Sequence, residues 1–220
     1  MKNQEYLKET YEWKDLLAIV HKLRQPDGCP WDSTQTYESM KKCVTDEAAE
    51  VVEAVEKEDF YKIRSLYWTL IDQEQDDPSF PHWKKGIHPS DEMILDSIDK
   101  GDLYVLSDGD EIAACVIAND EKVEGYADAP WQVDSDDIIV LHVLAVHPEY
   151  RGKGLARRLV ENVIEQERKA GKKALRLDVI ENNTTAERLY QKLGFRYIQT
   201  KTLYYDVVGE MTFKLYELVL

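Results

Sequence analysis

A short cluster of cationic residues and glycines is the feature of this sequence most suited to chemistry. Arg151, Gly152, Lys153 and Gly154 follow the apolar run 138–146 and precede a segment with helical spacing of apolar residues. The first amides of a helix have no partner within the helix and carry the positive end of its dipole, so they can hold a phosphate. Glycine lets the backbone approach such a group closely. The alternative is a plain strand-to-helix turn, because short glycine patterns recur by chance.

The spacing of this cluster distinguishes it from two common nucleotide-binding motifs. A P-loop requires GxxxxGK[ST], and that spacing is missing here. A dinucleotide-binding fingerprint requires GxGxxG, and Arg157 stands where its third glycine would fall. The cluster therefore predicts an anion site of another kind.

The residues around the cluster extend the pattern. Arg151, Gly154 and Ala156 fit R/Q-x-x-G-x-G/A, and residues 183–195 read N-x-x-A-x-x-L-Y-x-K-x-G-F. Both patterns resemble the two signatures of the GCN5-related N-acetyltransferases (the GNAT family), in that family's order and spacing. The resemblance covers residues 59–220. It implies a GNAT-like fold and an N-acetyltransferase that uses acetyl-CoA as its cosubstrate.

The resemblance also implies roles for the backbone. In the family the central strand, here Ile138 to Val146, carries a bulge and separates from the next strand, here Ala174 to Val179. The pantetheine arm of the cofactor enters between them, and one strand amide polarises the acetyl carbonyl. The strand residues implied in pairing with the arm are Leu144, Ala145 and Val146. The residues implied in holding the pyrophosphate are Arg151, Gly152, Lys153, Gly154, Leu155 and Ala156.

Tyr190 stands at the family position assigned to the acid that protonates the departing CoA thiolate. The resemblance implies that Asn183 and Tyr190 also contact the cofactor. The alternative for Tyr190 is core packing one helical turn after Ala186. We favour the acid, because the surrounding signature is complete.

His142 is the candidate base. It matches a strand histidine proposed as base or proton relay in arylalkylamine-type members of the family. A base or relay is needed because a free amine is mostly protonated at pH 7 and must be neutral to attack. The alternative, to which we give equal weight, is a buried histidine that keeps its proton for structural reasons. Asp137 and Glu111 are weaker candidates.

The resemblance does not identify the acetyl acceptor. It implies direct attack, within a ternary complex, by a primary amine of a small molecule or a peptide. Three aromatic residues could line an acceptor pocket, although such side chains more often belong to the core: Trp83, Tyr126 and Trp131.

The N-terminal segment carries a second resemblance. Residues 14–59, with the sequence GCPWD and a run of glutamates, resemble the start of MazG-type nucleotide pyrophosphohydrolases. In those enzymes the glutamate run binds Mg²⁺. Glu47 and Glu50 lie on one helix face and could share a hard cation. The carboxylates expected from the next helix fall on Leu66 and Thr69, so half of the metal site is missing.

This missing half decides how the N-terminal segment is interpreted. We favour a solvated acidic face over a working site, and expect no metal. The segment can then be a packing module, a surface that forms a homodimer, or a remnant. We assign residues 1–57 to a helical MazG-like fragment and residues 58–220 to the acetyltransferase domain.

Several elements must position these residues. Helical spacing of apolar residues covers 16–23, 40–55 and 63–71, and Ser90 can cap a further helix with Asp91 and Glu92 in its first turn. Strand patterns then cover 103–106, 111–118 and 138–146. A helix at 154–169, a strand at 174–179, a helix at 184–193 and two strands at 197–204 and 211–218 follow. This order predicts an α+β fold with a mixed central sheet flanked by helices and an all-helical N-terminal appendage.

Composition limits the class of protein. The chain has 220 residues, of which 43% are hydrophobic, and a net charge of 28 − 43 = −15. So acidic a protein would repel nucleic-acid phosphates, and we expect neither a nucleic acid nor a membrane as partner. The charged N-terminus does not resemble a signal peptide. The three cysteines lack the spacing of a disulfide framework or zinc site, which favours a cytoplasmic location.

Three hypotheses follow. The first is the acetyl-CoA-dependent N-acetyltransferase. The second is a protein derived from a nucleoside triphosphate pyrophosphohydrolase, against which the missing carboxylates argue. The third is a non-catalytic sensor that binds acyl-CoA but turns nothing over.

Overall fold

The structure is a computed structural model that describes residues 10–121, 125–205 and 209–220, with the backbone only at 49–57, 203 and 205. The chain divides into two compact units, Met1–Val55 and Glu56–Leu220. We call them the N-terminal unit and the C-terminal unit. None of the described helices is both long and apolar enough to cross a bilayer.

The N-terminal unit is helical where it is described. It contains α1 (Trp13–Leu23), the 3-10 helix η2 (Asp32–Thr34) and the first half of α2 (Tyr37–Glu74). The turn after α1 needs a glycine, because a Cβ at Gly28 would lie 2.4 Å from the Leu23 carbonyl oxygen. None of the described side chains in this unit is buried.

Helix α2 is continuous from Tyr37 to Glu74, so the prediction of two separate helices in this region is wrong. The two apolar patterns are separated by a polar stretch, residues 56–59, that contains neither glycine nor proline. A polar stretch without a breaking residue does not end a helix.

The C-terminal unit is built on a six-stranded mixed sheet with the order β1-β2-β3-β4-β6-β5, which confirms the predicted fold class. Its strands are β1 (Leu103–Asp108), β2 (Glu111–Asn119), β3 (Ile138–Val146), β4 (Ala174–Ile180), β5 (Arg196–Tyr205) and β6 (Gly209–Val219). Only β3 and β4 pair in parallel, and the other neighbours are antiparallel.

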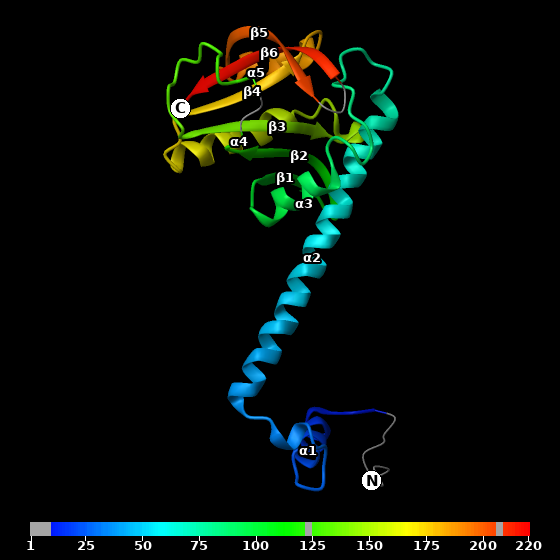
Figure 1. The fold of residues 1–220 in the computed structure, drawn as a ribbon. Coiled ribbons are helices and arrows are strands. Elements are labelled where there is room, and N and C mark those ends of the chain that lie inside the picture. The colour runs from blue at the N-terminus through cyan, green and yellow to red at the C-terminus, as the bar shows by residue number, and fades with distance from the viewer. Residues whose placement is uncertain (1–9, 122–124, 206–208) are drawn as a thin grey trace. The chain divides into compact units, whose positions relative to one another are not determined.

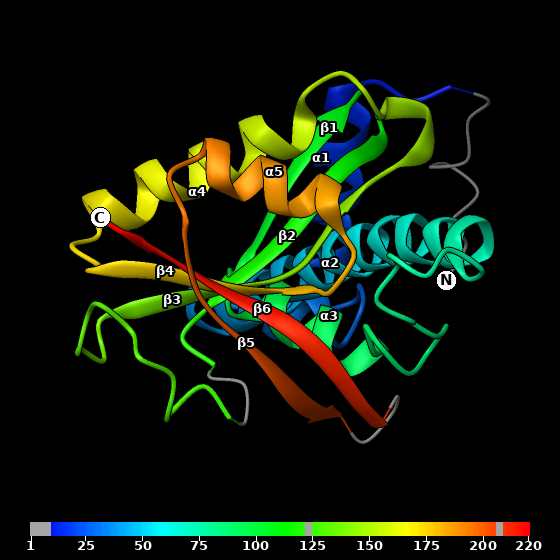
Figure 2. The ribbon, with the colours of Figure 1, turned by 90° about the horizontal axis from the view of Figure 1, so that it is seen from above.

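Helices cover both faces of this sheet (Figures 1 and 2). On one face, α4 (Leu155–Lys169) and α5 (Thr184–Lys192) pack over a core formed with Leu159, Val163, Leu175 and Leu177. On the other face, the second half of α2 and α3 (Asp91–Asp99) enclose a second core. Helices α4 and α5 begin and end within one residue of the predicted positions, and α3 begins directly after Ser90 as predicted.

Local capping explains why these helix boundaries were predictable. The Ser90 hydroxyl accepts a hydrogen bond from the Met93 amide at 3.0 Å and begins α3. The Asn183 side chain accepts from the Ala186 amide at 3.0 Å and begins α5. After α5, Gly194 has a φ of 93°, the left-handed conformation that commonly follows a helix end.

Candidate active site

Strands β3 and β4 pair at only one end. Their parallel register runs from Ile138↔Ala174 to Val140↔Arg176 and then stops, although both strands continue. We call the unpaired part, residues 141–146 of β3 facing 177–180 of β4, the strand opening. Backbone groups that border it on β3 are free to bind an extended ligand as an added strand would.

A bulge in β3 lies beside this opening. In the β2–β3 ladder, Ala145 is opposite Cys115 and His142 is opposite Ile117. Val143 and Leu144 therefore stand opposite the single residue between Cys115 and Ile117. Val143 has a φ of 47°, a left-handed conformation that is rare for a β-branched residue.

The ladder decides which backbone groups face the opening. The His147 amide donates to the Ala113 carbonyl at 2.9 Å. Residues two apart in an antiparallel strand point their amides the same way, so the backbone of Ala145 also faces β2. Leu144 and Val146, rather than Ala145, are left to offer their amides and carbonyls toward the opening.

The glycine turn that follows β3 leads directly into α4. Gly152 and Gly154 have φ values of 74° and 75°, and Gly154 is the N-cap of the helix. The first amide that bonds into the helix is that of Arg158, which donates to the Gly154 carbonyl at 3.1 Å. Within the described residues, the backbone amides from 152 to 157 donate no hydrogen bond. A Cβ at either glycine would meet nothing within 4 Å, so the amides border open space.

The cationic side chains of the turn have partners of their own. The Arg151 guanidinium is 2.6 Å from the Glu74 carboxylate at the end of α2. The Lys153 ammonium lies 4.5 Å from the centre of the Tyr150 ring. Both pairs are open to solvent, so an incoming phosphate can compete for these cations.

Tyr190 and Asn183 are both on α5. Tyr190 is buried, and its ring packs edge-on against Phe195 with centroids 5.5 Å apart. Burial and the nearby Asp178 carboxylate raise the pKa of Tyr190 above its usual range, so its hydroxyl carries a proton at neutral pH. The Asn183 side chain is used to cap the helix.

His142 lies on β3, two residues beyond the last β3–β4 pair. Its Nε2 atom is buried and has no hydrogen-bond partner. Burial lowers the pKa of His142 to about 4, although a backbone hydrogen bond at Glu121 opposes the shift. The ring is therefore neutral at pH 7, and one of its nitrogens is available to a ligand.

Asp178 was missed by the sequence analysis. It lies on β4, two residues beyond Arg176, and so is the register counterpart of His142 across the opening. Burial raises the pKa of Asp178, and the Tyr126 hydroxyl donates to its carboxylate at 2.6 Å. The available signal was an aspartate within the otherwise apolar end of a strand, LDVI.

The three aromatic residues proposed for an acceptor pocket fall into two groups. Trp83 packs on Tyr67, with centroids 5.6 Å apart, and lines a cavity of about 360 Å³ beside the end of α2. Tyr126 and Trp131 pack together, with centroids 5.3 Å apart, in the core that contains Ile138 and Phe213. Only the second group reaches Asp178, through the Tyr126 hydroxyl.

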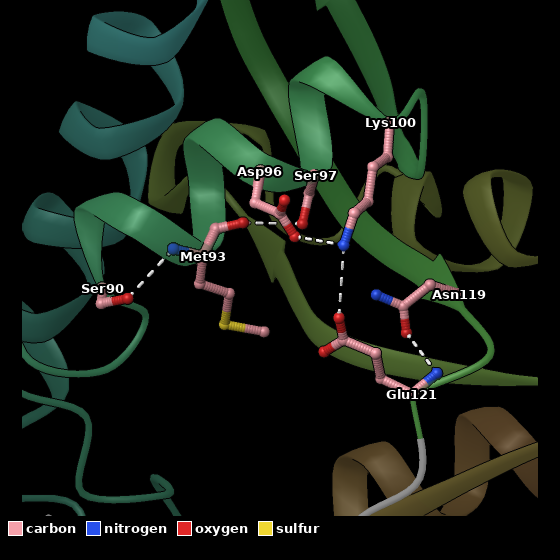
Figure 3. Close-up of polar contacts among 7 residues, drawn as sticks. All are labelled: Ser90, Met93, Asp96, Ser97, Lys100, Asn119 and Glu121. Carbon is pink, nitrogen blue, oxygen red and sulfur yellow. Dashed lines mark hydrogen bonds and ion pairs between the residues drawn. The ribbon is translucent and has the colours of Figure 1, made fainter.

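An acidic cavity of about 350 Å³ lies between α3 and the end of β2 (Figure 3). Its lining residues are Ser90, Glu92, Met93, Asp96, Ser97, Asn119 and Glu121. Lys100 spans its rim, 2.6 Å from the Asp96 carboxylate and 3.7 Å from that of Glu121. The backbone of Glu121 also raises the pKa of His142, against the larger effect of burial, so the cavity lies near the candidate base.

The weaker candidate bases and the proposed metal ligands have simpler surroundings. Asp137 and Glu111 are exposed residues at the beginnings of β3 and β2. Glu47 is exposed on α2, and the side chain of Glu50 lies outside the described residues. Within the part of the chain that is described, no three potential ligands gather around one point.

The C-terminal unit is similar to known acetyltransferases in sequence and in fold. Residues 57–195 match the model of the acetyltransferase (GNAT) family. An L-methionine sulfoximine/L-methionine sulfone acetyltransferase from Salmonella typhimurium is 34% identical over 84 residues, which are 36% of this chain and 49% of that protein. A solved acetyltransferase structure from Salmonella typhimurium, described with its cofactor acetyl-CoA, has a TM-score of 0.55 and 17% identity. It covers 74% of this chain and 88% of that one.

The N-terminal region has a different relative. The nucleoside triphosphate pyrophosphohydrolase MazG from Thermotoga maritima is 42% identical over 45 residues, which are 20% of this chain and 18% of that protein. The chain thus spans about half, or less, of the length of the curated relatives it matches.

Proposed function

The chain belongs to the acetyltransferase (GNAT) family, and from this premise we propose that it transfers the acetyl group of acetyl-CoA to a primary amine of a small molecule or peptide. The observation that carries the proposal is a continuous series of features along β3. The strand opening, the bulge and the glycine turn follow one another between His142 and Ala156. Each suits one part of an acyl-CoA, in the order in which those parts are linked.

The turn and the opening divide the binding of acetyl-CoA between them. The unpartnered amides from 152 to 156 suit the pyrophosphate, with Arg151 and Lys153 adding positive charge. The pantetheine arm enters the strand opening and pairs with the backbone of Leu144 and Val146. The Leu144 amide is the donor that we assign to the acetyl carbonyl, where it stabilises the negative charge that develops during attack.

Group transfer then needs two proton movements. The neutral amine uses its lone pair to attack the acetyl carbon, and the bond from that carbon to sulfur breaks. The departing thiolate takes the proton of the Tyr190 hydroxyl, which burial keeps protonated. The amine nitrogen loses one proton to a base, so charge and atoms balance.

The base has two candidates on opposite sides of the opening. His142 offers a buried, unpartnered Nε2, but a pKa of about 4 makes it a weak base. We therefore assign it the relay role, in which it accepts a hydrogen bond from the amine and passes the proton to water. Asp178, which already accepts a hydrogen bond from Tyr126, is the second candidate.

The acceptor class follows from charge and from the relative with a named substrate. The cavity near His142 is lined by Glu92, Asp96 and Glu121, and Lys100 pairs with Asp96 and Glu121 at its rim. The negative charge that remains favours binding of an amine in its cationic form. The Salmonella typhimurium relative is named for two amino-acid derivatives. Amino acids and their derivatives are therefore the first acceptors to test, with peptides second.

The N-terminal unit has a proposed role in self-association. Its α1 exposes 71% of Trp13 and 52% of Leu17, and exposed apolar surface of this kind marks association sites. Residues 1–55 carry 7 lysines and arginines against 11 acidic residues, so the apolar contact between two copies must exceed the repulsion of a net charge of 7 − 11 = −4 on each. We assign this face to a homodimer, which sedimentation of the parent and of Leu17→Glu would test. The three free cysteines favour a reducing compartment such as the cytoplasm.

Two measurements test the proposed function. Thermal unfolding with acetyl-CoA or CoA tests binding, and a ligand at about 100 times its Kd should add about 2.7 kcal/mol. Release of free thiol from acetyl-CoA, in the presence of an amine library, tests turnover. Binding together with turnover supports the enzyme. Binding without turnover for any amine supports the acyl-CoA sensor instead, and no binding contradicts both.

A further inference from the structure

The bulge of β3 is held by a side chain from another element. The hydroxyl of Tyr67, on the second half of α2, donates to the carbonyl oxygen of Val143 at 2.8 Å. Tyr67 is 1% exposed, so water cannot replace this hydrogen bond. Val143 is also the β-branched residue with a φ of 47°, a conformation that persists only where the surroundings enforce it.

Tyr67 also lies beside strand β2. Burial raises the pKa of Tyr67, and the neighbouring Cys115 side chain of β2 raises it further. Cys115 is itself opposite Ala145 in the ladder. Tyr67 therefore connects the two strands at the point where their register shifts.

The ring of Tyr67 is fixed as firmly as its hydroxyl. It packs edge-on against Trp83, with centroids 5.6 Å apart. It lies in the same buried cluster as Ile63, Leu66 and Leu70 from its own helix. The oxygen atom is therefore placed by the helix and the core together, not by a mobile side chain.

The geometry points to Tyr67 as a positioning residue for acetyl transfer, an inference that rests on the proposed function. A trans peptide directs its carbonyl and its N–H to opposite sides. By holding the Val143 carbonyl toward α2, Tyr67 fixes the plane of the Val143–Leu144 peptide. The Leu144 N–H then points away from α2 and toward the strand opening, where the acetyl carbonyl binds. Tyr67 itself touches neither the cofactor nor the acceptor.

The variant that tests this role is Tyr67→Phe, which keeps the ring and removes the hydroxyl. Acetyl-CoA presents a carbonyl that CoA lacks, so only acetyl-CoA senses the Leu144 amide. We expect CoA affinity to stay at the parent value, and the preference for acetyl-CoA over CoA to be lost. Turnover should fall by about 10²-fold, as misplacement of a reacting group by about 1 Å can cause, while KM for the acceptor is unchanged.

Two further variants separate positioning from general stability. Tyr104→Phe removes a comparable hydroxyl, which donates to Glu167 at 2.9 Å away from the opening, and should leave the acetyl-CoA preference unchanged. In Tyr67→Phe combined with Val143→Gly, glycine adopts the left-handed conformation without the strain. This pair should recover part of the lost turnover. If Tyr67→Phe acted only by destabilising the core, turnover would not recover in the double variant, because Val143→Gly removes a further packed side chain.

A measurement without ligand keeps this inference distinct from the proposed function. The ¹⁵N–¹H signal and hydrogen-exchange rate of the Leu144 amide report its environment whether or not acetyl transfer occurs. We expect both to change in Tyr67→Phe and not in Tyr104→Phe. An unchanged Leu144 amide in Tyr67→Phe would overturn the positioning role. A second outcome separates the two claims. If the parent protein binds acetyl-CoA no better than CoA, but the Leu144 amide signal still changes in Tyr67→Phe, the proposed function alone is contradicted.

Discussion

The two halves of helix α2 place their side chains in opposite surroundings. In the first half, Val44 is 63% exposed and Glu47 is open to solvent. In the second half, Leu66 and Tyr67 are 2% and 1% exposed and belong to the core of the C-terminal unit. The first half carries the likeness to pyrophosphohydrolases, and the second half belongs to the acetyltransferase.

This contrast concerns the two carboxylates that the resemblance to pyrophosphohydrolases leads us to expect at positions 66 and 69. A pyrophosphohydrolase would place carboxylates at the positions of Leu66 and Thr69. In this chain Leu66 is needed to fill the core beneath β2 and β3, and a carboxylate there would be buried without a partner. The position where the resemblance leads us to expect a carboxylate is therefore occupied by a core residue of the C-terminal unit.

The largest expected effect concerns the acid of the acetyltransferase site. Tyr190→Phe should lower turnover by about 10² to 10⁴, the usual contribution of a positioned acid. CoA affinity should change little, because the ring remains in the core. Stopped-flow measurement of the chemical step with a true acceptor checks this. If that step proceeds at the parent rate, the proton comes from water or another group.

The next effect tests the contrast along α2 directly. Leu66→Glu restores the carboxylate of the pyrophosphohydrolase pattern, and it should lower the free energy of unfolding by about 3–5 kcal/mol, because the new charge is buried and unpaired. Val44→Glu places the same side chain on the exposed half and should change stability by less than about 0.5 kcal/mol. Urea unfolding of both variants measures the difference. Equal losses of unfolding free energy in Leu66→Glu and Val44→Glu would contradict the difference in burial between the two halves of α2.

A smaller effect concerns the pH dependence of stability. The pKa of His142 is about 4 in the folded protein, against 6.5 for an unperturbed histidine. Between these values the unfolded chain binds a proton that the folded chain does not, so stability falls as the pH is lowered from 6.5 to 4. The contribution amounts to about 3 kcal/mol.

Replacement of the histidine should remove this contribution. His142→Gln should show a flatter loss of unfolding free energy between pH 6.5 and 4. His88→Gln serves as a comparison, because burial also lowers the pKa of His88. An unchanged pH profile in His142→Gln would show that the imidazole is not buried in its neutral form.

The smallest effect concerns the first half of α2. We expect no Mg²⁺-dependent hydrolysis of nucleoside triphosphates by the chain, because the sequence supplies only half of the carboxylates. Glu47→Gln should therefore leave both pyrophosphate release and thermal stability unchanged. Robust hydrolysis that Glu47→Gln abolishes would show that a complete metal site exists.

The predictable features of this protein are those decided by neighbours in the sequence. Ser90, Asn183 and Gly154 were assigned correctly to helix starts, because a cap depends on a few adjacent residues. The GNAT-like sheet was predictable because its signatures lie in two short segments. The continuity of α2 was missed because the polar stretch at 56–59, between two apolar patterns, resembles a helix end.

The features that escaped prediction join distant segments. The hydrogen bond from Tyr67 to Val143 links a helix to a strand across 76 residues of sequence. The hydrogen bond from Tyr126 to Asp178 spans 52. Neither has a local pattern, because the partners meet only when the sheet and helices are assembled. The unusual conformation of Val143 is invisible in sequence for the same reason, since valine ordinarily indicates extended strand.

The central claim is that acetyl-CoA binds with its pyrophosphate at the turn before α4. Gly154 and Gly171, at the two ends of α4, have φ values of 75° and 83°, and a Cβ at either would meet nothing within 4 Å. Gly154→Val and Gly171→Val therefore impose the same backbone strain, and only the first places a side chain at the proposed phosphate site. Calorimetric titration of acetyl-CoA into both folded variants should show affinity lost in Gly154→Val and retained in Gly171→Val. Equal affinity in the two variants would contradict the placement of the cofactor.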